Sequence, residues 1–537
     1  MHSCSTWLRL PPLDITRVLL VVSLLLTLAY NQAFYRNAAN IFAGSQGGMA
    51  FIASLSVFLF AATLLLLSLL CIRYLTKPVL ILVVLAAAGA SVYMNAYNIV
   101  IDTTMIDNIL RTDTREAADL MSADFVLQFA LLGVLPVLLI WRLPIRCAKF
   151  GREVLQRVKL ISLALGLMLL AIAPFTPHYT SFFREHKLLR YYANPVTPIY
   201  SALRFAADTL AEADSQARQL LGLDARIPAA DTTRELVILV VGEAARADHF
   251  GLNGYARDTT PLLAGENVIN FPHVSSCGTA TAYSLPCMFD VSGRSDFDLD
   301  TAHKRENALD VLQHAGVKVL WRDNNSDSKG VATNVTFEDF RSPERNPVCD
   351  VECRDIGMLQ GLDDYIAAQE SGDIVIVLHQ MGNHGPAYFK RYPKEFERFT
   401  PACNSNRLED CSDMEIRNAY DNAILYTDWF LSQVIAFLKH HDAGFETAMY
   451  YMADHGESLG ENGLYLHGLP WLLAPDTQKQ VASLLWFGSN YRVDRAALQQ
   501  AAQQELSHDN YFHTVLGLLE VEADVYNPGA DLLSGRH

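Results

Sequence analysis

The sequence predicts a chain in two parts, an α-helical membrane domain with five spans followed by an α/β domain built on a parallel sheet. Hydrophobic residues make up 51% of the chain, and the long apolar stretches behind this share lie in its first third. Further on, short apolar strands alternate with helical patterns, which is typical of a parallel sheet covered on both faces. We expect a membrane domain over residues 1–176, an amphipathic connector over 177–230 and an outer domain over 231–537.

Five apolar stretches have the length of a membrane-spanning helix, which needs about 20 residues to cross the bilayer core. A cleavable signal peptide is the alternative for the first stretch. No convincing small-residue cleavage site follows it, however, and four further spans come after it. The five stretches cover residues 15–33, 50–72, 78–98, 124–141 and 158–175.

Lys and Arg gather before the first span, between the second and third, and before the fifth. The positive-inside rule places these segments in the cytoplasm, and an odd number of spans then carries the outer domain across the membrane. The basic residues concerned are Arg9, Arg17, Arg73, Lys77, Arg142, Arg146, Lys149, Arg152, Arg157 and Lys159.

The outer part of the chain is strongly acidic. Residues 1–230 carry 19 Lys and Arg against 13 Asp and Glu, whereas the remainder carries 23 against 45. Because the outer part has no basic run, this balance argues against nucleic acid as a partner.

Six of the nine cysteines form three close pairs in the outer domain. Short local pairs predict disulfides, which need an oxidising compartment and therefore agree with the orientation above. A zinc site with cysteine ligands is the alternative, but no CxxC occurs and the pairs lie far apart. The pairs are Cys277 and Cys287, Cys349 and Cys353, and Cys403 and Cys411.

Metal-binding and charged side chains follow the predicted strands where these strands end. The carboxyl ends of parallel strands share one edge of the sheet, where ligands bind. A lone histidine is usually structural, but several strand ends with such residues argue against that reading. Carboxylates and imidazoles suit a catalytic zinc ion, which lowers the pKa of a bound hydroxyl. The predicted strands cover 236–242, 317–321, 374–378, 447–452 and 481–486, and the predicted helices 305–315, 355–369 and 415–439; the side chains are Glu243, Lys329 in the segment 323–329, His379, His384, Asp454 and His455, with His467 further on.

The stretch CGTATAYSLPC, residues 277–287, is a candidate nucleophile loop. Its hydroxyls, on Thr279, Thr281 and Ser284, stand on a short turn between two cysteines, and a clamped loop suits a nucleophile that must be held still. The alternative is a disulfide-closed surface loop in which the threonines are incidental.

An amphipathic segment, residues 99–123, is expected outside the membrane. On a helix, Asn108, Thr112 and Glu116 share one face because they recur every four residues. The alternative is the solvated face of an interfacial helix.

Six sequence blocks resemble the signature blocks of bacterial lipid A phosphoethanolamine transferases, the family of the mobile colistin-resistance enzymes. The resemblance covers essentially the whole chain. The blocks are GEAARADHFGLNGYARDTTP (242–261), SCGTATAYSLPCMF (276–289), WRDNNSDSKG (321–330), LHQMGNHGPAYFKRYP (378–393), YDNAILYTD (420–428) and ADHGESLGENGLYLHGLP (453–470).

This resemblance implies an outer domain similar to alkaline phosphatases and sulfatases, with one or two zinc ions. It implies that Thr281 is the nucleophile and binds the catalytic zinc together with Glu243, Asp454 and His455. It further implies that Lys329, His379, His384 and His467 bind phosphate or a second zinc, and that Asn108, Thr112 and Glu116 hold the ethanolamine headgroup. One departure is that Cys349 and Cys353 are only four residues apart, which is tighter than the middle disulfide of the family leads us to expect.

The reaction implied by the resemblance transfers phosphoethanolamine from phosphatidylethanolamine to a phosphate of lipid A through a phospho-threonine, which lowers the negative charge of lipid A and gives polymyxin resistance. We expect a monomeric, multi-pass protein of the Gram-negative inner membrane, surrounded by membrane lipid, with its catalytic domain in the periplasm. A sulfatase would need a Cys/Ser-x-Pro-x-Arg sequence, which neither Cys277 nor Cys287 begins. Transfer to core sugars of lipopolysaccharide, a phosphoglycerol transferase of the same fold and a non-catalytic membrane sensor are the alternatives. A sensor would be expected to lose part of the ligand set, and here every position is filled.

Overall fold

The computed structural model describes residues 13–44, 47–111, 121–146, 150–184, 186–212 and 218–535. The chain divides into two compact units. One combines Met1–Ile106 with Met121–Thr209, and the other combines Asp107–Leu120 with Leu210–His537. The boundaries at residues 176 and 230 stay predictions.

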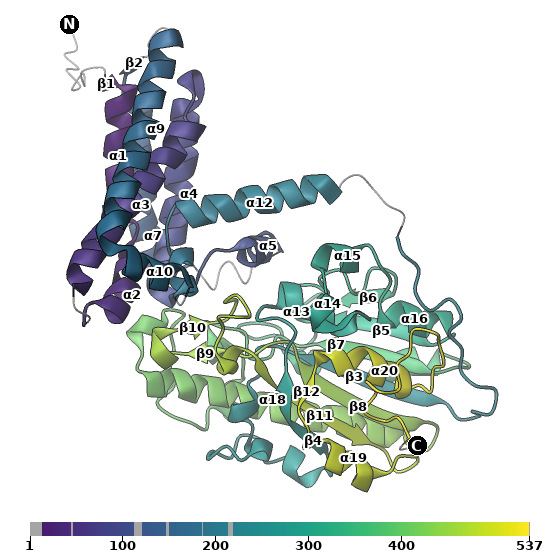
Figure 1. Cartoon of the computed structure of the whole chain (residues 1–537). Helices are drawn as coiled ribbons and strands as arrows, with labels where there is room; N and C mark the ends of the chain where they lie inside the picture. The colour runs from purple at the N-terminus through teal and green to yellow at the C-terminus, as the bar shows by residue number, and fades with distance from the viewer. Residues whose placement is uncertain are drawn as a thin grey trace, which may run out of the picture. The chain divides into compact units, whose positions relative to one another are not determined.

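The first unit is a bundle of apolar helices (Figure 1). Four helical stretches of the described residues are long and apolar enough to cross a membrane, or five if a bent pair counts as one span. They coincide with the five predicted stretches. The four are Gly48–Leu70 (α3), Arg73–Tyr97 (η1 and α4), Ala123–Arg142 (α7, the π-helical turn η2 and α8) and Phe150–Phe175 (α9 and η3); the bent pair is α1, Ile15–Ala29, with α2, Gln32–Phe42.

The first predicted stretch, residues 15–33, ends just past the 57° bend between α1 and α2, and the helical pair continues to Phe42. Two buried amides stabilise the break. The Asn31 side chain donates to the carbonyl of Leu26 at 2.9 Å, and the Asn194 side chain donates to those of Tyr30 at 3.2 Å and Ala87 at 2.8 Å. These bonds connect the break to α4 and pair the carbonyl of Tyr30, which lies at the end of α1 in an apolar environment.

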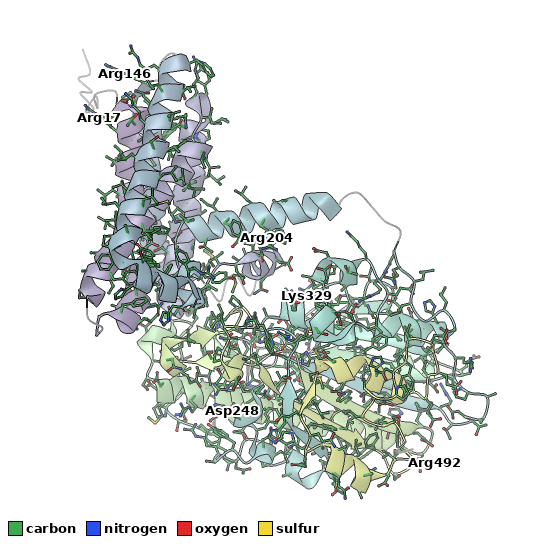
Figure 2. All side chains as sticks on the ribbon, in the orientation of Figure 1. Arg17, Arg146, Arg204, Asp248, Lys329 and Arg492 are labelled. Atoms are coloured by element: carbon green, nitrogen blue, oxygen red, sulfur yellow. A yellow bond between two sulfur atoms is a disulfide. The ribbon has the colours of Figure 1, made fainter. Side chains whose placement is uncertain are left out.

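Two of the basic segments that were predicted to be cytoplasmic lie together at one end of the membrane unit (Figure 2). Strand β1 (Leu13–Asp14) pairs in parallel with β2 (Ile145–Arg146). This pairing brings two of the predicted cytoplasmic segments together, and Arg17 and Arg146 lie at the same end of the bundle (Figure 2). Four shorter helices follow elsewhere in the chain: α5 (Thr103–Arg111), α10 (Thr176–Arg184), α11 (Lys187–Tyr191) and α12 (Val196–Glu212).

The outer unit contains a sheet of eight strands in the order β12-β4-β11-β8-β3-β7-β5-β6 (Figure 1). Its central strands are buried at every position because their continuous apolar runs are covered on both faces. The strands are β3 (Glu235–Gly242), β4 (Ile269–Ser275), β5 (Lys318–Asp323), β6 (Thr336–Asp339), β7 (Ile374–His379), β8 (Glu446–Ala453), β11 (Gln480–Phe487) and β12 (Leu506–Ser507).

Strand β11 departs from the predicted parallel sheet, because it runs antiparallel to both of its neighbours, β4 and β8. Residues 454–479, which connect β8 to β11, contain no α-helix. They contain only the small hairpin of β9 (Ser458–Leu459) and β10 (Tyr465–Leu466) and short 3₁₀ turns. A parallel return needs a longer crossover, usually a helix, so this connection brings the chain back in the opposite direction.

The longest helix of the outer unit, α18 (Asp413–His441), contacts β8 and begins with a capping box between Ser412 and Glu415. The predicted helix over 355–369 is instead divided into a 3₁₀ turn, Asp355–Leu359, and α17, because Gly361 has a φ of +73° between them. The other helices are α13 (Thr281–Phe289), α14 (Gly293–Asp296), α15 (Leu299–His303), α16 (Ala308–His314), α17 (Leu362–Ala367), α19 (Arg495–Ala501) and α20 (Tyr511–Gly517).

The outer unit contains the three predicted disulfides. The middle pair closes a very short turn, in which the backbone amide of Asp350 donates to the carbonyl of Glu352 at 3.0 Å. The short spacing of Cys349 and Cys353 is therefore compatible with pairing.

Candidate active site

The carboxyl ends of three adjacent parallel strands form the floor of the site. In the register of the sheet, Val241 of β3 lies beside His379, the last residue of β7. Gly242 lies beside Ala453, the last residue of β8. Residues that follow directly after these strands, among them Glu243 and Asp454, therefore meet at one edge of the sheet.

Glu243, Asp454 and His455 form a buried cluster that fits a metal ion. One ligand atom of each lies within 4.8 Å of the others. The Nε2 atom of His455 is 3.4 Å from Oε1 of Glu243 and 3.5 Å from Oδ2 of Asp454. All three side chains are fully buried. Buried carboxylates in contact with an imidazole need a compensating charge, which a bound cation supplies.

The hydrogen bonds of the cluster orient the ligand atoms toward this point. The backbone amides of Ala244 and His455 donate to Oδ1 of Asp454 at 3.1 and 2.8 Å. Its Oδ2 atom is buried and has no hydrogen-bond partner among the described residues. Nδ1 of His455 donates to the carbonyl of Gly456 at 2.8 Å, which leaves Nε2 as the ligand atom.

Thr281 brings a hydroxyl directly to this cluster. Its Oγ1 atom donates to Oε2 of Glu243 at 3.0 Å and lies 3.2 Å from Nε2 of His455. Thr281 is the first residue of α13, and a helix N-terminus favours an anion because its first N–H groups have no partner within the helix. The disulfide between Cys277 and Cys287 closes the loop and the first turns of this helix.

The other two hydroxyls of the loop are used for structure. Thr279 donates to the carbonyl of Leu469 at 2.6 Å, and Ser284 donates to the carbonyl of Asp454. Of the three candidates, Thr281 is the one whose hydroxyl contacts the metal-binding side chains, so the geometry favours it as the nucleophile.

His379 lies beside the cluster with one nitrogen engaged. Its Nδ1 atom donates to Oδ2 of Asp323 at 2.8 Å, and Trp321 donates to the same oxygen at 2.9 Å. Burial tends to lower the pKa of His379, but the Asp323 carboxylate outweighs burial and the pKa is raised. Nε2 of His379 is buried and has no hydrogen-bond partner among the residues described. It is therefore available to a phosphate oxygen or a metal.

His467 and His384 form a second group next to His455. The ring of His467 is 4.2 Å from that of His455 and 5.9 Å from that of His384, measured between centroids. Nδ1 of His467 donates to Oε2 of Glu457 at 2.8 Å, and Tyr388 donates to the other oxygen of Glu457 at 2.5 Å. Burial lowers the pKa of His467 well below its usual value, so the ring is neutral and can act as a ligand.

The loop after β5 reaches the cluster through an amide. Asn325 donates to Oε2 of Glu243 at 2.9 Å and to the carbonyl of Gln380 at 2.7 Å. Lys329 lies in the same loop, is buried, and donates from Nζ to the carbonyl of Ser326 at 2.8 Å. The same loop therefore contributes the buried ammonium group of Lys329 and, four residues earlier, the amide of Asn325 that contacts Glu243.

Comparisons with known proteins identify the family. Residues 235–521 match the family model Sulfatase, and residues 59–210 match the model Phosphoethanolamine transferase EptA/EptB. The chain is 43% identical to phosphatidylethanolamine transferase Mcr-1 of Escherichia coli and 38% identical to phosphoethanolamine transferase EptA of Escherichia coli strain K12, with 98% of each chain covered in both cases. It belongs to the phosphoethanolamine transferase family. The structure of the integral membrane lipooligosaccharide phosphoethanolamine transferase A (EptA) from Neisseria meningitidis is similar, with a TM-score of 0.93, 34% identity and coverage of 98% of this chain and 100% of that one.

Of the three residues predicted to hold the lipid headgroup, the structure of this transferase describes one. Asn108 lies in α5, Thr103–Arg111. Thr112 and Glu116 lie outside the described residues. Their shared helix face therefore stays a prediction.

Sequence reasoning included Asp323 and Asn325 only within the segment 323–329 and gave neither a role, and it missed Glu457. The transferase places all three against the predicted site residues. Each lies within a sequence block that was already singled out. Glu457 follows His455 by two residues, and a carboxylate so close to a ligand in sequence was a usable signal. Asn325 gave none, because its contact depends on the path of the loop after β5.

Proposed function

We propose that this transferase moves phosphoethanolamine from phosphatidylethanolamine to a phosphate group of lipid A, with Thr281 as the residue that carries the group. The proposal rests on one observation above the others. The Thr281 hydroxyl contacts both Glu243 and His455 of the buried metal-binding cluster, while the hydroxyls of Thr279 and Ser284 bond to backbone carbonyls.

The donor set at the site fits zinc. Glu243, Asp454 and His455 supply two carboxylates and an imidazole, and Oδ2 of Asp454 and Nε2 of His455 are oriented toward one point. Zinc with three protein ligands and one open position is the usual catalytic arrangement. When bound there, it lowers the pKa of the Thr281 hydroxyl and neutralises a phosphate oxygen.

In the first step, Oγ1 of Thr281 forms a bond to the phosphorus of phosphatidylethanolamine, and the bond from phosphorus to the diacylglycerol oxygen breaks. The threonine loses its proton, for which Oε2 of Glu243 is the acceptor at 3.0 Å, and the diacylglycerol oxygen takes up a proton as it leaves. The amino-terminal N–H groups of α13 face the negative charge that the phosphate carries.

In the second step, an oxygen of a lipid A phosphate attacks the same phosphorus, the bond to Oγ1 breaks, and Oγ1 takes back the proton held by Glu243, which regenerates Thr281. Both steps exchange one P–O bond for another. Lys329, His379, His384 and His467 bind the phosphate groups or a second zinc ion in this proposal. The added ethanolamine amine offsets negative charge on lipid A and weakens the binding of cationic peptides such as polymyxins.

The transferase acts in this proposal as a monomer in the inner membrane, with the outer unit in the periplasm. The donor keeps its acyl chains in the bilayer, so its headgroup has to be met near the membrane surface. Asn108, Thr112 and Glu116 would hold that headgroup, with the Glu116 carboxylate paired to the ethanolammonium.

Mass spectrometry of lipid A tests the proposed acceptor. Cells that express the wild type should contain lipid A carrying one more phosphoethanolamine group, and cells that express Thr281→Ala should not. Modified core oligosaccharide beside unmodified lipid A would show that the acceptor is wrong.

The headgroup role has a separate test with an internal control. Glu116→Ala should impair transfer from phosphatidylethanolamine in membranes but should leave cleavage of a small soluble phosphoethanolamine ester unchanged. Transfer to lipid A at the wild-type rate would remove Glu116 from the proposal and would leave Thr281 in place.

A further inference from the structure

A second acidic cluster lies at the opposite, amino-terminal edge of the same sheet. Glu235 is the first residue of β3, Asp373 immediately precedes β7, and Asp231 lies just before β3 in the chain. One oxygen of each side chain lies within 4.8 Å of the others. Glu235 and Asp373 are only 2% and 3% exposed, so solvent does little to screen the repulsion between their carboxylates.

Hydrogen bonds satisfy these carboxylates only in part. Thr233 donates from its backbone amide and its hydroxyl to Oδ1 of Asp231, both at 3.0 Å, and its Oγ1 atom lies 3.1 Å from Oε1 of Glu235. The backbone amide of Glu235 donates to Oδ1 of Asp373 at 3.0 Å. Oε2 of Glu235 is buried and has no hydrogen-bond partner among the described residues. A buried carboxylate oxygen without a donor inside an acidic cluster needs either a bound cation or a proton shared with a neighbouring carboxylate.

Arg234, the neighbouring cation in sequence, directs its donors elsewhere. It donates from Nε to the carbonyl of Gly372 at 2.9 Å and from Nη2 to the carbonyl of Gln369 at 3.0 Å. Its guanidinium also lies over the ring of Phe445, 4.7 Å from the centroid. These hydrogen bonds go to backbone carbonyls and not to the three carboxylates of the cluster.

We propose that Asp231, Glu235 and Asp373 bind one calcium ion, which holds the starts of β3 and β7 together. A donor set of oxygen atoms alone suits a hard cation, and it lacks the imidazole that distinguishes the zinc cluster at the other edge. Calcium accepts six to eight oxygen ligands, so carbonyl and water oxygens complete the shell.

This site is separate from the active site. The eight residues of β3 put the two edges roughly 25 Å apart. Lys329 and Arg492 mark opposite sides of the outer unit in Figure 2. The amide of Arg492 bonds at 3.5 Å to Glu446, which pairs with Glu235 in the register of β3 and β8. Calcium at this edge therefore acts on the stability of the sheet and does not touch the reacting atoms.

A proton shared between Glu235 and Asp373 is the competing explanation. Burial, together with the adjacent Asp373, raises the pKa of Glu235 to about 9, so in the absence of a cation this carboxyl group stays protonated at neutral pH. The two explanations differ in one measurable respect, because only the calcium site responds to the concentration of calcium.

The test is the melting temperature of the full-length protein in detergent at neutral pH, with zinc held saturating and calcium raised to several times about 1 mM, where extracellular calcium sites bind. Wild type should gain about 2 °C or more in a saturable manner, and magnesium should give less. Asp373→Asn should lose this response. The matched control is Glu370→Gln, which removes an exposed acid outside the cluster and should keep the response.

Equilibrium dialysis with calcium supplies a direct count, with one ion bound to wild type and to Glu370→Gln and none to Asp373→Asn. Glu235→Gln serves if Asp373→Asn does not fold, and it should also lose the ion while keeping its zinc content. A melting temperature that calcium leaves unchanged in wild type, or an equal calcium response in wild type and a folded cluster variant, overturns the calcium site and supports the shared proton.

Discussion

The two edges of the outer sheet gather carboxylates in the same way but give them different partners. At the carboxyl edge, Glu243 and Asp454 meet the imidazole of His455 and the hydroxyl of Thr281. At the amino edge, Glu235 and Asp373 meet a third carboxylate and no imidazole. Strand β3 thus contributes to two clusters, completed by residues next to β8 at one edge and β7 at the other, whose donor atoms select different cations. The difference teaches that a reaction needs more than buried charge and a hydroxyl. Both edges place a threonine hydroxyl against their carboxylates, Thr281 at one and Thr233 at the other, and only the first edge adds the imidazole of His455.

The largest effect should come from the nucleophile at the carboxyl edge. Thr281→Ala removes the hydroxyl and one methyl group at a buried position, so transfer to lipid A should fall by about 1,000-fold or more while the melting temperature falls by only a few degrees. Thr279→Ala is the matched control and should retain activity, because the Thr279 hydroxyl donates to the carbonyl of Leu469 and not to the cluster. If Thr279→Ala were inactive and Thr281→Ala active, Thr281 would not be the nucleophile.

The second-largest effect should be a loss of bound zinc, which we expect in variants of the carboxyl edge but not in a variant of the amino edge. Glu243→Gln, Asp454→Asn and His455→Ala should each lower the zinc content of purified protein, measured by elemental analysis, because each removes one ligand of a small set. Asp373→Asn at the other edge should keep its zinc. An unchanged zinc content in all three carboxyl-edge variants would show that these residues do not bind zinc.

A smaller effect should follow from the carboxylate behind His379. Asp323→Asn keeps the shape of the side chain but removes the charge that orients the imidazole and raises its pKa, so kcat should fall by about 10–100-fold. The pH dependence of kcat should change as well, which a merely structural role would not produce. Wild-type kcat and an unchanged pH profile would argue that His379 takes no part in the reaction.

The smallest effects should come from the disulfides, because they lie outside both clusters. Replacing either pair, Cys277 with Cys287 or Cys403 with Cys411, by serine should lower the free energy of unfolding by about 2–3 kcal/mol in chemical denaturation. Only the first replacement should also reduce kcat, since it releases the loop that leads to Thr281. Equal activity in the two double variants would mean that the clamp plays no part in placing the nucleophile.

Much of the architecture could be predicted because long apolar runs leave clear signals. The five spans and the strands β3, β5, β7, β8 and β11 lie where such runs occur. Strand β4 was missed because Asn270, Pro272 and His273 interrupt its apolar pattern, and β12 because it has only two residues. The direction of β11 could not be read, since an apolar run looks the same in a parallel and an antiparallel strand.

The site residues likewise fall into those that the sequence could predict and those that it could not. Glu243, Asp454 and His455 follow directly after buried strands, so the sheet alone brings them together. Asn325 and Glu457 lie in loops, and their contacts depend on hydrogen bonds that form only once the loops are folded. The break between α1 and α2 was hidden for the same reason, because Asn194, whose side chain stabilises it, lies 164 residues from Tyr30 in the sequence.

The disulfide between Cys277 and Cys287 also has a consequence for when the transferase becomes active. Thiols stay reduced in the cytoplasm, so a chain still under synthesis has no covalent clamp on its nucleophile loop. The clamp forms once the outer unit has reached an oxidising compartment. Export and closure of the loop that carries Thr281 are thereby linked by one covalent bond, which cannot form while the chain is in the cytoplasm.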